Sequence, residues 1–258
     1  MLHGLFIGIN YTGTENRLNG CINDARRWYN LFKGNRRLMI EGECTRVAVL
    51  KAIRDLVTQA TNGDEIILTI SSHGTDVKDK GIENDTAFVP YDLKLIIDDE
   101  FAELFSLTNV PITFITDCCN SGTMSRDLES TPRYIPYNQL PEQTLKSVPK
   151  SDNPHVVHLS GCKDDESSMD QKFGNYYYGN LTYHATNAYK PNMTFKQWYD
   201  SFMPLKKQTP QLSGPTNRLV PGSKMQQTST IQYPKILYRN GDTLYEPSGW
   251  RPVTDSNN

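Results

Sequence analysis

Two residues of the chain combine the chemistry of a nucleophile and of the base that would activate it. Cys119 comes two residues after the apolar run 112–117, and His73 comes two residues after a similar run, 65–71. A thiolate is a strong nucleophile, and an imidazole has a pKa near neutrality, so it can take up the thiol proton. The pair is therefore a candidate for nucleophilic catalysis. Read singly, Cys119 is equally a buried packing residue and His73 part of a turn, and these readings stay open.

Both runs have the composition of buried β-strands. They are short and rich in Ile and Thr, which favours a strand over a helix. Open α/β sheets carry their chemistry at the carboxyl ends of the strands, where Cys119 and His73 fall. Gly74 and Gly122 follow them closely and allow backbone N–H groups to approach a substrate carbonyl. We therefore predict that sulfur and imidazole meet at one edge of a single sheet.

Two acids, Asp24 and Asp117, form a second constellation. Asp117 lies two residues before Cys119. A carboxylate beside a thiol raises the pKa of the thiol, so an acid at this position is expected to bind a cationic group instead. The competing interpretation is that Asp24 is a helix-start acid and Asp117 a turn acid. The sequence alone leaves both interpretations open.

Further acids are clustered in loop-like segments. Clustered carboxylates are the ligands that a hard cation such as calcium prefers. Their spacing matches no EF-hand loop, and a solvated acidic face or a helix start explains the same pattern. The acids concerned are Asp85, Asp98, Asp99 and Asp127.

The composition is that of an ordinary globular protein of 258 residues. A formal charge of −2 and a pI near 6.2 provide no overall field that would attract nucleic acid or an acidic membrane surface. No apolar run approaches the ~20 residues of a membrane helix, and residues 1–9 do not resemble a signal peptide. We therefore expect a cytoplasmic protein. Five irregularly spaced cysteines predict no disulfide framework, and no CxxC spacing supports a redox or metal role for the adjacent Cys118 and Cys119.

The remaining segments predict an α/β protein. The order strand, helix, helix, strand implies parallel strands joined by right-handed crossovers. Residues 123–154 are polar and contain several prolines, which predicts a long surface loop. We expect one domain over 1–214 and a peripheral tail over 215–258 with a hairpin at 231–244. The predicted strands are 4–9, 65–71, 86–90, 112–117, 155–161 and 211–213, and the predicted helices are 19–32, 45–62, 98–107, 181–189 and 194–203.

Five motifs in a fixed order resemble those of the metacaspases, a family within the caspase-like cysteine peptidases. Two of them are Ser71-Ser72-His73-Gly74 and Asp117-Cys118-Cys119-Asn120-Ser121-Gly122, and the other three lie at 6–10, 18–25 and 159–165. The resemblance covers roughly residues 4 to 213. It implies a caspase-like three-layer α/β sandwich, in which a central, mostly parallel sheet has helices on both faces. It also favours a monomer, and because no proline-rich or zinc-binding prodomain precedes the core, we expect a minimal member of the family.

The same resemblance implies roles for the residues at this edge of the sheet. His73 and Cys119 are the implied catalytic dyad, and the N–H groups of Gly74 and Cys119 are the implied oxyanion hole. An acidic S1 pocket would select Arg or Lys at P1, the substrate residue before the cleaved bond. The residues implied to line that pocket are Cys21, Asp24, Ser71 and Asp117. The implied activity is that of a cysteine endopeptidase acting on proteins or peptides.

The resemblance also implies calcium activation and self-processing. Asp98 and Asp99 match the acidic pair that binds calcium in the family, and Asp85 and Asp127 match further ligands. Candidate self-cleavage points are basic residues in the polar segment that we predict to be exposed. They are Lys146 and Lys150, with Arg126 and Arg133 as alternatives.

Two departures from the family pattern support a different function. Asn120 stands where the family commonly has His, and the segment between His73 and Asp98 is shorter than usual. The alternative is a catalytically weak or inactive caspase-like module that binds basic peptides or calcium as a regulator. Against it, both implied dyad residues and both pocket acids are present.

Overall fold

The computed structural model describes residues 1–77, 85–119, 130–145, 153–163, 166–206 and 208–223, and the strands β13 (Tyr238–Asn240) and β14 (Thr243–Tyr245). The chain divides into two compact units, Met1–Gln226 and Gln227–Asn258. In the second unit β13 and β14 pair antiparallel as a hairpin. The boundary predicted at residue 214 stays a prediction. The central sheet and its helices belong to the first unit.

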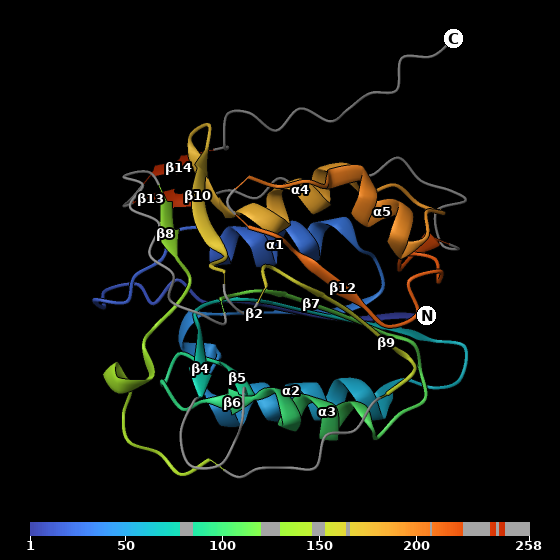
Figure 1. Ribbon diagram of the computed structural model, residues 1–258, viewed down its shortest axis with the longest axis horizontal. Coiled ribbons are helices and arrows are strands. Elements are labelled where there is room, and N and C mark those ends of the chain that lie inside the picture. The colour runs from blue at the N-terminus through green and yellow to red at the C-terminus, as the bar shows by residue number, and fades with distance from the viewer. Residues whose placement is uncertain are drawn as a thin grey trace. The chain divides into compact units, whose positions relative to one another are not determined.

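A six-stranded sheet with the order β12-β9-β7-β3-β1-β2 forms the middle layer of the first unit (Figure 1). All neighbouring strands are parallel except the edge strand β12, which is antiparallel to β9. β1, β3 and β7 are buried along almost their whole length, so their sequences are nearly continuous apolar runs. The strands are β1 (Leu2–Gly8), β2 (Asn35–Ile40), β3 (Glu65–Ser71), β7 (Ile112–Asp117), β9 (Val156–Ser160) and β12 (Gln211–Ser213).

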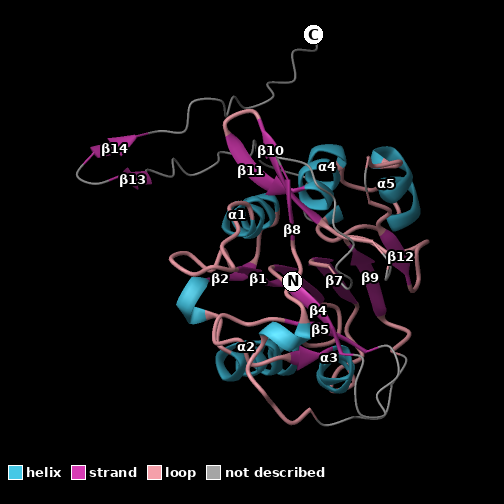
Figure 2. Ribbon diagram, turned by 60° about the vertical axis from the view of Figure 1, so that its left-hand side comes forward, coloured by secondary structure: helices cyan, strands magenta, loops and turns pink. Residues whose placement is uncertain are grey.

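Helices cover both faces of this sheet. One face carries α1, α4 and α5, and the other carries α2 and α3 (Figures 1 and 2). The helix α2 begins after Thr45, whose hydroxyl accepts a hydrogen bond from the N–H of Ala48. The predicted three-layer α/β sandwich with a mostly parallel sheet is therefore confirmed. The helices are α1 (Cys21–Leu31), α2 (Arg46–Gln59), α3 (Asp98–Phe105), α4 (Asn180–Ala188) and α5 (Phe195–Phe202).

Alternate side chains of the central strands enter two separate cores. In β1, Leu5 belongs to the core that includes α2 and α3, whereas Phe6 belongs to the core that includes α1, α4 and α5. Phe114 and Ile115 of β7 divide in the same way. Packing on both faces fixes the register of the strands. The segments that follow their carboxyl ends therefore start from fixed positions.

Two small antiparallel sheets are built from segments that follow those carboxyl ends. Residues 130–145 lie inside the predicted surface loop, but they contain β8, a short 3-10 helix (Tyr137–Gln139) and the buried side chains of Arg133 and Ile135. The loop prediction is wrong for this part, because its burial depends on β8 pairing with β10, far away in sequence. The sheets are β4 (Gly74–Val77), β5 (Asp85–Phe88) and β6 (Ile96–Ile97), and β8 (Ser130–Pro132), β10 (Met169–Phe173) and β11 (Tyr176–Gly179).

A further 3-10 turn, Glu41–Glu43, precedes α2. Within the described ranges, no helix is both long enough and apolar enough to cross a membrane.

Candidate active site

His73 and Cys119 lie at the same edge of the central sheet. The register of β3 and β7 pairs Ser71 with Asp117, so the two segments leave the sheet side by side. Gly74 lies so close to the carbonyl oxygen of Cys119 that an added Cβ would overlap it. The N–H groups of Gly74 and Cys119 point at one atom, the carbonyl oxygen of Arg133, at 2.9 and 3.2 Å. Two backbone donors thus converge on one carbonyl beside the thiol, which is the geometry of an oxyanion hole.

The imidazole of His73 is oriented by a backbone carbonyl. Its Nε2 lies 2.7 Å from the carbonyl oxygen of Asn16, and because a carbonyl can only accept, Nε2 carries the hydrogen. The lone pair is then on Nδ1, a buried atom without a hydrogen-bond partner among the described residues. Burial lowers the pKa of His73 to about 4. At neutral pH the ring is therefore a neutral imidazole with a free acceptor nitrogen.

The thiol of Cys119 is completely buried. Its Sγ donates to the carbonyl oxygen of Ser168 at 2.9 Å. Burial raises the pKa of Cys119 well above its ordinary value. In this arrangement the sulfur is a protonated thiol, and all five cysteines of the chain are free.

Three carboxylates surround the buried guanidinium of Arg133. Its Nη2 lies 2.6 Å from Asp24 Oδ2 and 3.0 Å from Asp170 Oδ1, and its Nη1 lies 3.4 Å from Asp117 Oδ1. Burial alone would lower the pKa of Arg133, but the Cys21 thiol and the three carboxylates raise it well above its ordinary value. Burial raises the pKa of Asp24 to about 7, and the guanidinium opposes that rise. The cluster is an acidic pocket that holds a positively charged group.

Backbone N–H groups also donate hydrogen bonds to two of the carboxylates. Asp24 accepts from the N–H of Gly179 at 3.0 Å, and Asp170 accepts from the N–H groups of Asn19 and Gly20 at 2.8 and 2.9 Å. A Cβ on Gly20 would overlap Asp170, so this close approach requires glycine. These N–H donors stabilise the ionised form of the two carboxylates. They also fix the positions of the carboxylate oxygens.

The third carboxylate, Asp117, is held by side chains as well as by a helix terminus. It accepts from the N–H and the hydroxyl of Thr182, in the first turn of α4, at 2.9 and 2.7 Å, and from the hydroxyl of Ser168 at 2.5 Å. The positive end of the α4 dipole favours an anion at this place. The carboxylate of Asp117 is therefore held in a fixed position in the pocket.

The other two predicted pocket residues are also buried at this edge. Cys21 is the first residue of α1, and burial raises the pKa of its thiol well above the ordinary value. Ser71 ends β3 and lies opposite Asp117 in the sheet. Three of the four predicted S1 residues therefore surround Arg133, and Ser71 lies beside one of them in the sheet.

The prediction from sequence did not include Asp170 in this pocket. Asp170 lies in β10, outside every motif, and no local pattern distinguishes it from a surface acid. Arg133 was predicted to be exposed, and that prediction is wrong, because its side chain is fully buried. The apolar Ile135, two residues after Arg133 in a Pro-rich segment, is the only local sign of this burial.

Only two of the four predicted calcium ligands have side chains among the described residues. Asp98 and Asp99 begin α3, where Asp98 Oδ1 accepts from the N–H of Asp99 at 3.0 Å. The side chain of Asp85 and all of Asp127 lie outside the described residues, as do Lys146, Lys150 and Asn120. Within the described ranges no group of three or more His, Cys, Asp or Glu side chains could hold a metal ion. Two carboxylates are too few for calcium, which takes 6–8 oxygen ligands, so calcium stays a prediction.

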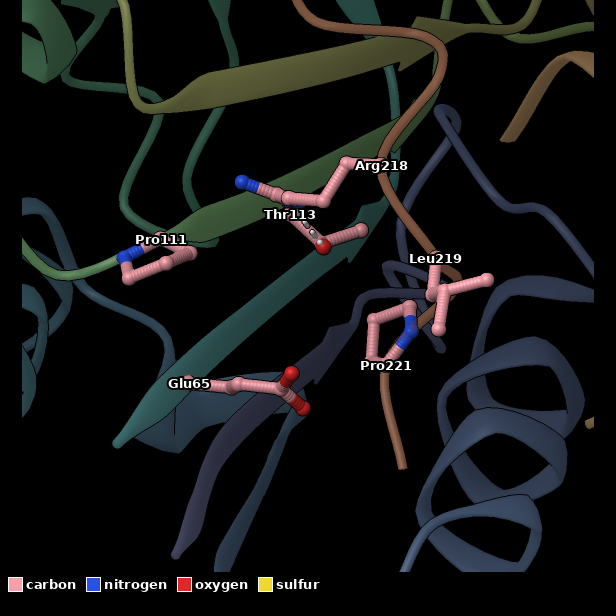
Figure 3. A pocket seen from close by; sticks show the side chains of 6 residues that line it. All are labelled: Glu65, Pro111, Thr113, Arg218, Leu219 and Pro221. Atoms are coloured by element: carbon pink, nitrogen blue, oxygen red, sulfur yellow. Dashed lines mark hydrogen bonds between the residues drawn. The ribbon is translucent and has the colours of Figure 1, made fainter. Parts of the chain in front are cut away.

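A pocket at the opposite end of the sheet has different chemistry (Figure 3). It lies at the amino ends of β3 and β7 and contains Glu65, Thr113 and Arg218. Arg218 donates to the carbonyl oxygens of Ile112 and His155 and to the hydroxyl of Thr113. Its lining contains neither cysteine nor histidine, so this pocket is not the candidate site for thiol chemistry.

Comparisons with known proteins agree with this geometry. The caspase domain family matches residues 2–219. Metacaspase-6 of Arabidopsis thaliana is 36% identical over 137 residues, which are 46% of this chain and 37% of that protein. Metacaspase-5 of Trypanosoma cruzi is 30% identical over 198 residues, which are 64% of this chain and 43% of the relative. The matched part thus spans less than half of the length of either relative.

A solved structure has the same fold. The crystal structure of protein GSU0716 from Geobacter sulfurreducens is 22% identical in sequence, with a TM-score of 0.62, and the match covers 82% of this chain and 92% of that one. At that identity the likeness shows the fold alone. The family match over residues 2–219 shows more, and the chain belongs to the caspase domain family, as a relative of the metacaspases.

Proposed function

We propose that the chain is a cysteine endopeptidase that cleaves peptide bonds after Arg or Lys. One observation carries the proposal: a pocket of three carboxylates holds a guanidinium whose own carbonyl oxygen accepts from the N–H groups of Gly74 and Cys119. The proposal combines this cation pocket and these two N–H donors with the thiol of Cys119 and the neutral imidazole of His73, which follow neighbouring strands of the sheet. That combination fits the recognition and cleavage of a basic residue.

The proposed mechanism uses residues that are all at this edge of the sheet. His73 Nδ1 takes the proton of the Cys119 thiol, and the thiolate attacks the carbonyl carbon of the P1 residue. The N–H groups of Gly74 and Cys119 stabilise the negative oxygen of the tetrahedral intermediate. His73 then returns the proton to the leaving amine, and water hydrolyses the thioester.

The charge of the pocket supports selection of a basic residue. Asp24 and Asp170 both face Nη2 of the guanidinium, so a planar group with several donors makes more contacts there than an ammonium does. We therefore propose that Arg is preferred over Lys. An acidic P1 residue would bring a further negative charge into a buried anionic site and would be rejected.

Calcium activation is a separate proposal. Asp98 and Asp99 supply oxygen ligands of the type that calcium prefers. When bound, the ion would add positive charge and order the surrounding acids. No step of the proposed mechanism depends on it.

The test is hydrolysis of short fluorogenic peptides that end in Arg, Lys or Asp, by the full chain with and without added Ca²⁺. We expect turnover of the Arg and Lys peptides and at least about 100-fold slower turnover of the Asp peptide. Cys119→Ala should remove the activity. Cys44→Ala, a matched change at a buried thiol outside the site, should retain it.

Two results would contradict the proposal. One is Arg-peptide turnover that is unchanged in Cys119→Ala. The other is a chain that binds a labelled Arg peptide but never hydrolyses it with or without Ca²⁺, which would support the binding module instead.

A further inference from the structure

Tyr11 lies against the imidazole of His73, on the segment that follows β1. The side chain of Tyr11 is fully buried, and the centres of the two rings are 4.9 Å apart, with an interplanar angle of 38°. This segment leaves the sheet beside β3, because the N–H of Ile9 donates to the carbonyl oxygen of Ser71 at 3.0 Å. One side of the proposed base is therefore covered by a residue that the proposed mechanism does not use.

The hydroxyl of Tyr11 joins this ring to the backbone around His73. It donates to the carbonyl oxygen of Val89, and the N–H of Val89 donates to the carbonyl oxygen of His73 at 3.1 Å. Burial raises the pKa of Tyr11 well above its ordinary value, although hydrogen bonds with the His73 backbone and the Ser72 side chain oppose the rise. The phenol therefore stays neutral, so it can fix the position of His73 but does not exchange protons with it.

The backbone of Tyr11 begins the turn that carries the carbonyl group of Asn16. The carbonyl oxygen of Tyr11 accepts from the N–H and the hydroxyl of Thr14 at 3.1 and 2.8 Å, and the N–H of Asn16 donates to the same hydroxyl at 3.2 Å. The carbonyl oxygen of Asn16 is the acceptor that lies 2.7 Å from His73 Nε2. Tyr11 thus contacts the imidazole ring and also fixes, through Thr14, the backbone acceptor on which the tautomer of that ring depends.

Tyr11 adopts a backbone conformation that bulky residues avoid. Its φ is 50°, in the left-handed region where a side chain is disfavoured. Such strain persists only where the surrounding contacts outweigh it, and it is concentrated at functional sites. Gly and Asn adopt this conformation more readily, so the turn by itself does not need a tyrosine. The presence of Tyr11 is therefore explained by what its ring and its hydroxyl contact.

We propose that Tyr11 is a positioning residue for the reaction, which holds the imidazole of His73 and the carbonyl group of Asn16 so that Nδ1 remains the acceptor. This inference rests on the proposed function, because it concerns the base of that mechanism. A neutral imidazole has two tautomers, and only the one with its hydrogen on Nε2 can take the thiol proton at Nδ1. A tilted ring or a displaced carbonyl group would allow the other tautomer, which has no acceptor there.

Tyr11 also keeps water from one side of the imidazole. Burial is the main reason why the pKa of His73 is lowered to about 4, the hydrogen bond with Asn16 opposes this effect, and the guanidinium of Arg133 adds to it. Loss of the Tyr11 ring should therefore raise the pKa of His73 toward its ordinary value of about 6.5. The tautomer and the pKa are two properties that a residue important only for stability would not change.

The first measurement is NMR of the imidazole nitrogens in the full chain, in a Cys119→Ala background. The signals of His73 are identified by their loss in His73→Gln. With Tyr11 in place we expect the tautomer with its hydrogen on Nε2 and a pKa near 4. In Tyr11→Leu we expect a mixture of tautomers and a pKa above about 5, because water reaches the ring.

The second measurement is the hydrolysis of Arg-terminated peptides by the chain with Cys119 intact. Tyr11→Leu should lower kcat about 30-fold or more at pH 7.5 and change KM less than about 3-fold, because the base is disturbed and the acidic pocket is not. The loss should grow toward about 10-fold further at pH 5.5, where a histidine with an ordinary pKa is mostly protonated. Tyr11→Phe keeps the ring without the hydroxyl and should stay within about 10-fold of the wild-type kcat.

Because Tyr11→Leu empties a buried position and can fail to fold, Thr14→Val is the second variant. Thr14 is exposed, and the change removes the hydroxyl that joins Tyr11 to Asn16 while both residues stay in place. We expect a folded chain with mixed His73 tautomers and a kcat about 3- to 10-fold lower. Tyr189→Leu is the matched control, since the Tyr189 hydroxyl also donates to a carbonyl group but its ring packs against the other core. It should leave the tautomer and kcat unchanged.

The possible failures are distinguishable. If Tyr11→Leu folds and keeps the wild-type kcat, or keeps the wild-type tautomer and pKa of His73, the inference is wrong and the proposed function stands. Where Tyr11→Leu does not fold, an unchanged tautomer and kcat in Thr14→Val overturn it in the same way. Equal losses of kcat in Tyr11→Leu and Tyr189→Leu also overturn it, because they indicate a general effect on stability. If the wild-type chain hydrolyses no peptide with or without Ca²⁺, the proposed function fails, and the role of Tyr11 in catalysis fails with it.

Discussion

Two arginines at opposite ends of the central sheet are held by opposite kinds of partner. Arg133, at the carboxyl end, is fully buried and faces the carboxylates of Asp24, Asp117 and Asp170. Arg218, at the amino end, is half-buried and donates to two backbone carbonyls and a hydroxyl, with its guanidinium 5.1 Å from the centre of the Phe195 ring. Burial lowers the pKa of Arg218 to about 10, whereas the pKa of Arg133 is raised.

We interpret the contacts of Arg218 as structural and the surroundings of Arg133 as a recognition pocket. The hydrogen bonds of Arg218 go to neutral acceptors and join the segment around it to the amino ends of β7 and β9, while the nearby carboxylate of Glu65 only partly opposes the lowering of its pKa. Around Arg133 the carboxylates outnumber the cation, and a structural ion pair has no need of that excess. An excess of fixed negative charge is what a site needs if its cation is to be exchanged for another, as a substrate residue would be.

Removal of each guanidinium should give the largest contrast. In a Cys119→Ala background, which prevents any cleavage, we expect Arg133→Gln to lower the free energy of unfolding by about 3–5 kcal/mol, because it strands buried carboxylates. Arg218→Gln should cost about 1–3 kcal/mol, since its carbonyl partners are neutral and can bind water. Urea denaturation measures both.

A second substitution sharpens this contrast. Asp24→Asn added to Arg133→Gln should recover part of the loss, because it removes one of the stranded charges. If both arginine substitutions lower the free energy of unfolding equally, and Asp24→Asn recovers none of it, the distinction between a recognition pocket and a structural contact is wrong.

At the carboxyl end of the sheet, lowering the pH should remove the stability that His73 contributes. The pKa of His73 is lowered to about 4, so between its ordinary pKa of 6.5 and pH 4 the unfolded chain takes up a proton that the folded chain does not. Stability from this group is therefore present at neutral pH and is lost as the pH falls through that window, by roughly 3 kcal/mol in all. Asp24, with a pKa raised to about 7, acts in the opposite direction.

A difference measurement isolates the histidine. The unfolding free energy of Cys119→Ala minus that of Cys119→Ala/His73→Gln should fall from pH 6.5 to pH 4, since the contribution of Asp24 is present in both proteins. His158, whose pKa burial also lowers to about 4, provides a matched control and should give a similar slope. A flat difference for His73 would mean that its imidazole is not buried as a neutral base.

The acids of the pocket should control specificity rather than stability alone. Asp170→Asn is expected to lower kcat/KM for Arg peptides about 10- to 100-fold, because it removes one charged partner of the guanidinium. Glu65→Gln, beside Arg218 at the other end of the sheet, should leave kcat/KM unchanged. A normal kcat/KM in Asp170→Asn would remove Asp170 from substrate recognition.

What the sequence could predict differs between the parts of this site. His73, Cys119 and Asp117 follow or end apolar strands, so their common position follows from the rule that parallel strands carry chemistry at their carboxyl ends. Asp170 and Arg133 reach the same pocket through the pairing of β8 with β10. That pairing is between segments distant in sequence, and neither has a long apolar pattern. A charged residue in a Pro-rich segment is ordinarily exposed, and only tertiary contacts reverse this for Arg133.

The smallest effect should come from an ion pair that has neither burial nor excess charge. Lys51 and Asp55 form an i,i+4 pair in α2 at 2.6 Å, with both side chains exposed. Because water and salt screen such pairs, Lys51→Ala should change the free energy of unfolding by no more than about 0.5 kcal/mol, and 1 M salt should remove most of that. A loss comparable to that of Arg133→Gln would mean that distance alone, rather than burial and the surplus of carboxylates, decides what an ion pair contributes in this protein. The N–O distance in this pair is equal to or shorter than the N–O distances around Arg133. The expected near-absence of an effect is therefore the control that assigns the stability of the Arg133 cluster to its burial.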